Sequence, residues 1–110
     1  MQRQSSMPDL LANLRLLESA EGYATLGLYM RSNQDLEQMD AETRQWPEVL
    51  AVKLAIFNGL HLWEMMEIVA VQLHDCAQGN PRWISIAETA RRETHAARRR
   101  ESIFARHTFV

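Results

Sequence analysis

Residues 46–64 read WPEVLAVKLAIFNGLHLWE, and this stretch carries most of the information that decides the fold. Pro47 suits the first turn of a helix, and Gly59 favours the end of that helix. The residues between them place apolar side chains at the spacing of a helical face. Trp63 then opens a second run of the same kind. The stretch therefore predicts a helical hairpin, with helices over about 47–59 and 62–77.

The rest of the chain contains similar helix-boundary residues. Pro8 and Pro81 each mark the start of a helix, and Asn80 precedes Pro81 as a cap. Further helices are expected over about 8–26, 29–39 and from 81 onward, with residues 40–45 as a connection. No Gly or Pro follows Pro81, so the sequence leaves open whether a turn near residues 94–95 divides the last helix. Leu, Ala, Met, Glu, Gln and Arg dominate the composition, which predicts an all-α fold.

A shift of 34 residues brings these features into register. Proline falls on proline, and aromatic or aliphatic residues fall on residues of similar character. The matched positions are Pro47 with Pro81, Leu16 with Leu50 and Ile84, Tyr23 with Phe57, Leu26 with Leu60, and Tyr29 with Trp63. Such periods are typical of chains in which each helical pair buries its apolar face against the next pair. We expect repeats over about 13–46, 47–80 and 81–110 within a single domain of residues 1–110.

Segments 16–29 and 47–64 resemble the tetratricopeptide repeat (TPR), in which a short turn separates two helices and an aromatic residue opens the second. The resemblance is close over about residues 13–80 and loose over 81–110. It implies a right-handed α-α superhelix, which is a stack of antiparallel helical hairpins with two complete repeats and a degenerate third. The small residue that the family has early in its second helix is Ser32 in the first repeat but Met66 in the second. We therefore expect a wider helix crossing in the second repeat.

The TPR-like layout also implies a function. The first helices of successive repeats line a groove that suits a peptide or a helix of a partner protein. The groove residues implied by this layout are Leu17, Glu21, Glu48, Ala51, Ala55, Asn58, Arg82, Ser85 and Arg92. The resemblance therefore predicts a protein-interaction module, or scaffold, whose protein or peptide partner is unidentified.

The uneven distribution of charge supports two alternatives. Residues 1–80 contain eleven acidic and five basic residues, whereas residues 81–110 contain three acidic and seven basic ones. A self-assembling structural subunit, such as a homodimer, would use the C-terminal helix through Ile103, Phe104 and Phe109. A nucleic-acid-binding adaptor would use the arginine-rich C-terminal segment. The acidic body repels phosphates and disfavours this second alternative.

Motifs for catalysis or for metal binding are missing from the sequence. It has no Gly-rich phosphate loop, no nucleophile elbow and no His-Glu-x-x-His motif, so we expect neither an enzyme nor a cofactor. His74 and Cys76 would point in different directions from a helix, so no metal site is predicted. The single cysteine suits a reducing compartment, and no apolar run approaches the roughly 20 residues that span a membrane. We expect a cytoplasmic protein with no membrane partner.

Overall fold

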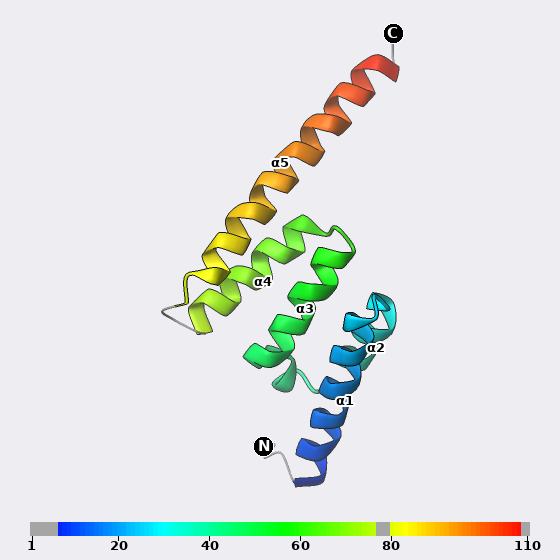
Figure 1. Cartoon of the computed structure of the whole chain (residues 1–110), viewed down its shortest axis with the longest axis vertical. Helices are drawn as coiled ribbons and strands as arrows, with labels where there is room; N and C mark the ends of the chain where they lie inside the picture. The colour runs from blue at the N-terminus through cyan, green and yellow to red at the C-terminus, as the bar shows by residue number, and fades with distance from the viewer. Residues whose placement is uncertain (1–6, 77–79, 109–110) are drawn as a thin grey trace.

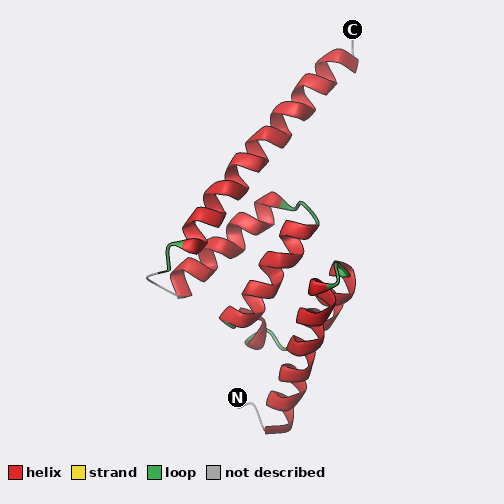
Figure 2. Ribbon diagram, viewed as in Figure 1, coloured by secondary structure: helices red, strands yellow, loops and turns green. Residues whose placement is uncertain are grey.

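A computed structural model of the chain describes residues 7–76 and 80–108, and for residues 7, 8 and 104–108 it describes the backbone alone. The described part contains five α-helices, one 3₁₀ helix and no strand (Figure 1, Figure 2). These elements are α1 (Met7–Thr25), α2 (Tyr29–Glu37), the 3₁₀ helix η1 (Thr43–Gln45), α3 (Pro47–Gly59), α4 (Trp63–Cys76) and α5 (Arg82–Thr108). The predicted all-α fold is confirmed, and the bounds expected from proline and glycine agree with the structure to within about two residues.

The last helix, α5, is continuous for 27 residues, so no turn divides it near residues 94–95. Its start is capped as the sequence predicts: the Oδ1 atom of Asn80 accepts a hydrogen bond from the backbone N–H of Arg82 at 3.0 Å. The described part of segment 81–110, expected to form a degenerate third repeat, is thus one helix without a hairpin partner of its own.

The turn between α1 and α2 ends α1 with a Schellman motif, in which two backbone N–H groups bond back to the last helical carbonyls. The N–H of Leu28 donates to the carbonyl of Tyr23 at 2.8 Å, and the N–H of Gly27 donates to that of Ala24 at 3.0 Å. The motif requires a left-handed backbone at its central residue. Gly27 supplies it with φ of 77° and, lacking a Cβ atom, adopts this conformation without strain.

The turn between α3 and α4 has the same bonds 34 positions later. The N–H of Leu62 donates to the carbonyl of Phe57 at 2.8 Å, and the N–H of His61 donates to that of Asn58 at 3.2 Å. The left-handed residue here is His61, with φ of 58°. The two turns therefore share one backbone hydrogen-bond pattern, but the second uses a residue with a side chain where the first uses glycine.

Helix α3 is the central helix, because its two sides belong to two different hydrophobic clusters. Val49, Val52 and Ile56 join residues of α1 and α2 in the first cluster. Leu50 and Leu54 join residues of α4 and α5 in the second cluster. Phe57 packs against both clusters and links them.

The molecule is elongated, with principal extents of 62 × 31 × 31 Å. Helix α4 packs against α3 on one side and against α5 on the other. At 1.5 Å per residue, the 27 residues of α5 span about 40 Å, against about 21 Å for the 14 residues of α4. The C-terminal half of α5 consequently projects beyond the rest of the molecule (Figure 1).

No helix in residues 7–76 or 80–108 is both long enough and apolar enough to cross a lipid bilayer.

Candidate functional site

The groove residues implied by the TPR-like layout lie on α1, α3 and α5, and eight of the nine are exposed. The exception is Leu17, which is only 9% exposed and packs in the first cluster. Its assignment to the groove is wrong, because a side chain in the core cannot contact a partner. On α3, the residues Glu48, Ala51, Ala55 and Asn58 together form the one face that the two clusters leave open. We call these four residues the α3 face.

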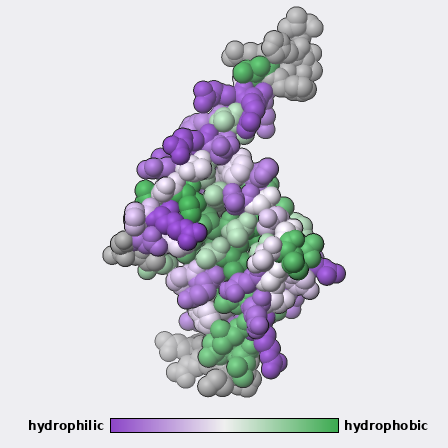
Figure 3. Space-filling view, viewed as in Figure 1, coloured by the Kyte–Doolittle hydropathy of each residue, from purple (hydrophilic) through white to green (hydrophobic). Residues whose placement is uncertain are grey.

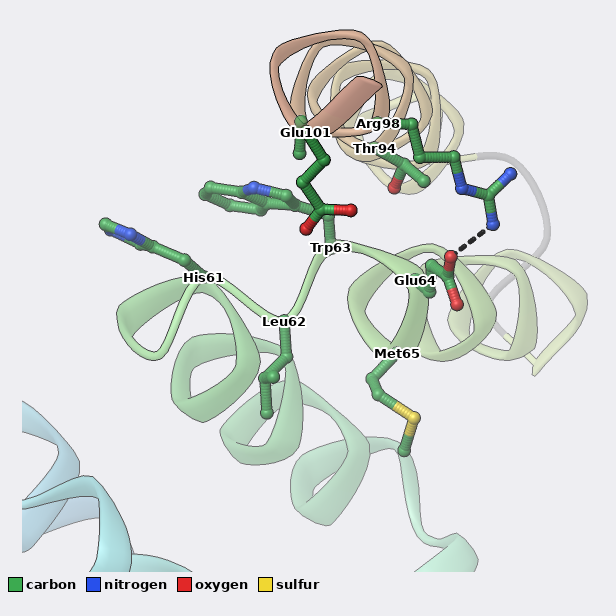
Figure 4. A pocket seen from close by; sticks show the side chains of 9 residues that line it. His61, Leu62, Trp63, Glu64, Met65, Thr94, Arg98 and Glu101 are labelled. Atoms are coloured by element: carbon green, nitrogen blue, oxygen red, sulfur yellow. Dashed lines mark hydrogen bonds and ion pairs between the residues drawn. The ribbon is translucent and has the colours of Figure 1, made fainter. Parts of the chain in front are cut away.

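A different surface combines a cavity with aromatic, apolar and charged side chains. An open cavity of about 280 Å³ lies where the α3–α4 turn meets the middle of α5 (Figure 4). We call it the turn pocket. Its lining residues are His61, Leu62, Trp63, Glu64 and Met65 from the turn and the start of α4, and Thr94, Ala97, Arg98 and Glu101 from α5. None of the predicted groove residues is among them.

One wall of the turn pocket is formed by two stacked rings. The centroids of His61 and Trp63 are 5.0 Å apart, with an angle of 14° between the ring planes. Trp63 is half-buried and also packs against the second cluster. Leu62 and Met65 also line the cavity and are 44% and 47% exposed, with side chains that point away from α5 (Figure 4). The surface is therefore rich in the large aromatic and apolar side chains that dominate binding at protein interfaces.

His61 has its ring in this wall because its backbone is in the left-handed region. That conformation is costly for a residue with a Cβ atom, by about 1 kcal/mol relative to glycine. Glycine stands at the equivalent position of the first turn, so the fold does not need a side chain there. Unfavourable backbone conformations of this kind cluster at binding and catalytic sites.

The charged side of the turn pocket is held by an ion pair between helices. Arg98 of α5 donates to the Oε1 atom of Glu64 on α4 (Figure 4). Farther along the same seam, Arg91 donates to the Oε1 atom of Glu67 at 3.0 Å. These pairs cross the seam between α4 and α5 at the surface, whereas the apolar residues of the second cluster hold the two helices together.

The same pairs reduce the positive charge available to a nucleic acid. Of the arginines on α5 whose side chains are described, Arg91 and Arg98 form ion pairs with α4, whereas Arg82, Arg92, Arg99 and Arg100 form none with a described residue. The side chain of Arg106 lies outside the described residues. Phosphate binding depends on the number of free cations, so this arrangement weakens the nucleic-acid alternative.

Other predicted residues are only partly within the described structure. Ile103, expected to mediate self-association, is 54% exposed on the projecting part of α5. The side chain of Phe104 and the whole of Phe109 lie outside the described residues. Cys76 is a free, exposed thiol at the end of α4. Among the described residues, no three His, Cys, Asp or Glu side chains are grouped so that they could hold a metal ion.

Sequence reasoning did not identify the turn pocket. It identified Trp63 only as the start of the second apolar run and gave His61 no role. One signal was available: no helix breaker follows Pro81, so an uninterrupted helix would be longer than α4 and would pass over the α3–α4 turn.

Compared with models of protein families, with curated proteins and with solved structures, the chain gave no match.

Proposed function

We propose that the protein is a protein-interaction module that binds a helix or an extended peptide of a partner at the turn pocket. The observation that carries this proposal is the left-handed backbone of His61. His61 adopts this costly backbone where glycine would suffice, and its ring stacks on Trp63 in a pocket that exposed Leu62 and Met65 also line. The partner supplies an apolar or aromatic anchor residue, which fits against that wall.

The composition of the rim supports a protein partner over a small molecule. The cavity is open to solvent, so that a chain can lie across it. The lining combines aromatic and apolar side chains with the charged residues Glu64, Arg98 and Glu101, a mixture that is usual at protein interfaces. The α3 face, predicted from the sequence, is a second candidate surface on the same molecule.

The proposal can be tested with a phage-displayed library of random peptides selected on the full chain. Enriched peptides are then measured by fluorescence anisotropy against His61→Gly and Met65→Ser. Both variants are expected to weaken binding at least tenfold, since each removes part of the wall or its neighbour. His61→Gly is expected at the same time to raise the free energy of unfolding, because glycine relieves the left-handed backbone.

Two further variants locate the peptide. Ile68→Ser is the matched control, since Ile68 is 56% exposed on α4 but does not line the turn pocket. Its affinity is expected to equal that of the wild type. Ala55→Arg places a large side chain on the α3 face. Loss of binding in Ala55→Arg together with full binding in His61→Gly would show that the peptide binds the α3 face and not the turn pocket. A selection that enriches no peptide would contradict a peptide-binding site at either surface.

A further inference from the structure

One side of α1 is not covered by the rest of the protein. Leu14, Glu18 and Glu21 follow one another at helical spacing and so lie on the same side of α1. Leu14 is 44% exposed, and both glutamates are exposed. Neither glutamate forms an ion pair with another described residue. These three residues, which we call the α1 face, are apolar toward the start of the helix and acidic toward its end.

The outer side of α5 has the opposite character. Arg92, Arg99 and Ile103 lie on one side of the helix, about 100° around it from the arginines that pair with α4. Ile103 is 54% exposed, and both arginines are exposed. The Nη2 atom of Arg92 donates to the Oγ1 atom of Thr89 at 3.2 Å, and in the described part of the chain neither arginine has an acidic partner. We call these three residues the α5 face.

The two faces match residue by residue when the helices run antiparallel. When Ile103 lies opposite Leu14, Arg99 lies opposite Glu18. Arg99 is four positions from Ile103, and Glu18 is four positions from Leu14. Arg92 then falls about 6 Å along the axis from Glu21, which is within the reach of its side chain. Apolar side chains meet at one end, and opposite charges meet along the remainder.

The two faces lie on helices that α3 and α4 separate (Figure 1). Figure 1 shows α1 at the N-terminal end and the projecting part of α5 at the other, and the longest extent is 62 Å. Figure 3 shows apolar surface at the end where α1 begins, whereas the projecting part of α5 is largely hydrophilic. One molecule therefore cannot bring its own two faces together.

From this complementarity we infer that the α5 face of one molecule binds the α1 face of a second copy of this chain. The contact is head to tail, since it joins two different surfaces. Such a contact leaves one free face at each end and propagates into a chain of molecules unless the rotation between copies closes a ring. Neither face includes a residue that lines the turn pocket, so the inference is independent of the proposed function.

A charge-swap experiment tests this contact. Sedimentation velocity is measured over a concentration series at about 0.05 M and 0.5 M salt, with surface charges screened in the second. The wild type is expected to grow in mass with concentration at low salt and to lose this growth at high salt. Glu18→Arg with Glu21→Arg, and separately Arg92→Glu with Arg99→Glu, are each expected to weaken self-association at least tenfold. An equal mixture of the two variants restores it, since every contact then joins opposite charges.

The matched control is Glu37→Arg with Glu42→Arg, which makes the same change in net charge at exposed positions outside both faces. This control is expected to assemble far more strongly than the Glu18 and Glu21 variant. A wild type that stays monomeric at about 1 mM and low salt would overturn the inference. So would a mixture of the two charge-swapped variants that assembles no better than either variant alone, or a dimer that survives both pairs of substitutions.

Discussion

The two hairpins turn in the same way but are joined by different kinds of contact. In α1–α2 the crossing is made by Ala20 and Ser32, both 0% exposed, and the Ser32 hydroxyl donates to the carbonyl of Ala20 at 2.7 Å. In α3–α4 the residues 34 positions later are Leu54 and Met66, each 7% exposed in the second cluster. The backbone of the turn is thus independent of the side chains that fill the crossing. Local hydrogen bonds determine the conformation of the turn. Side-chain volume determines which residues fit at the crossing of each helix pair.

The polar contacts of the two hairpins also differ in kind. The first hairpin is tied to the loop before α3 by the buried Asn13, whose Nδ2 atom donates to Thr43 Oγ1 at 3.1 Å and to Asp40 Oδ2 at 3.3 Å. Around the second hairpin, the polar contacts with α5 are ion pairs on the surface. Buried hydrogen bonds are costly to break because they leave unsatisfied groups, whereas surface ion pairs contribute little. The first hairpin is therefore the part of the fold that is more sensitive to substitution.

Exchanging the crossing residues gives the largest expected effect. Ser32→Met forces a long side chain into a fully buried site and removes the bond to Ala20, so we expect a loss of at least about 3 kcal/mol in the free energy of unfolding. Met66→Ser leaves a cavity in the second cluster and is expected to lose about 2–4 kcal/mol. Urea unfolding measures both changes. Ser19→Met, at an exposed position of α1, should change stability by about 0.5 kcal/mol or less.

The two helical glycines, Gly22 and Gly59, separate a steric effect from helix propensity. A Cβ atom on Gly59 would lie 2.1–2.6 Å from ring atoms of Tyr29, whereas one on Gly22 would have no atom within 4 Å. Gly59→Ala is expected to destabilise by about 1–3 kcal/mol, because the ring between the two hairpins must move. Gly22→Ala is expected to stabilise by about 0.5–1 kcal/mol. Thermal unfolding of both variants checks the signs, and equal effects would contradict the contact between Tyr29 and Gly59.

The sequence was sufficient to predict the helices, because the ends of a helix depend on residues that are close in the chain. Pro47 and Gly59 fix the ends of α3, and the Asn80 cap fixes the start of α5 without help from distant residues. The offset of 34 residues was likewise visible, since it follows the same turn residues and apolar positions.

The features that the sequence could not predict depend on contacts between side chains that are distant in the chain. Asn13 was unremarkable on α1, and residues 40–45 were predicted only as a polar connection, yet both contribute to one buried hydrogen-bond group. The left-handed backbone of His61 was not predicted, because histidine adopts this conformation far less often than glycine, which stands at the equivalent position 27. Leu17 was misassigned because the family layout treats its position as open, whereas here it packs in the first cluster.

Lys53 provides a smaller, pH-dependent difference between the hairpins. It is half-buried on α3, and the equivalent residue of α1, Ser19, is exposed. Burial, and then the nearby charge of Arg44, lower the pKa of Lys53 below its usual value of 10.5. The folded protein therefore releases this proton at a lower pH than the unfolded chain. Since the unfolded chain binds more protons in that interval, stability rises with pH between the lowered pKa and 10.5.

Lys53→Met is expected to remove this rise and to add about 0.5–1 kcal/mol at pH 7, an amount limited by the water that screens a half-buried charge. The measurement is urea unfolding of both proteins at pH 7 and pH 10. The difference between the two proteins isolates the titration of Lys53, which is the only lysine of the chain. A stability difference that is the same at both pH values would contradict the lowered pKa.

The two ion pairs between α4 and α5 give the smallest effect, and they differ in exposure. The Glu67 side chain is 27% exposed and that of its partner Arg91 is 59% exposed, whereas Glu64 and Arg98 are 64% and 65% exposed. Water and salt screen the second pair more than the first. A double-mutant cycle with glutamine at both positions is therefore expected to give a coupling energy of about 0.5 kcal/mol for Glu67–Arg91 and about 0.2 kcal/mol for Glu64–Arg98. The cycle is necessary because Glu64 lies in the first turn of α4, where a carboxylate also interacts with the helix dipole. That contribution cancels between Glu64→Gln and the double variant. Equal coupling energies that persist at 0.5 M salt would show that exposure does not govern these pairs.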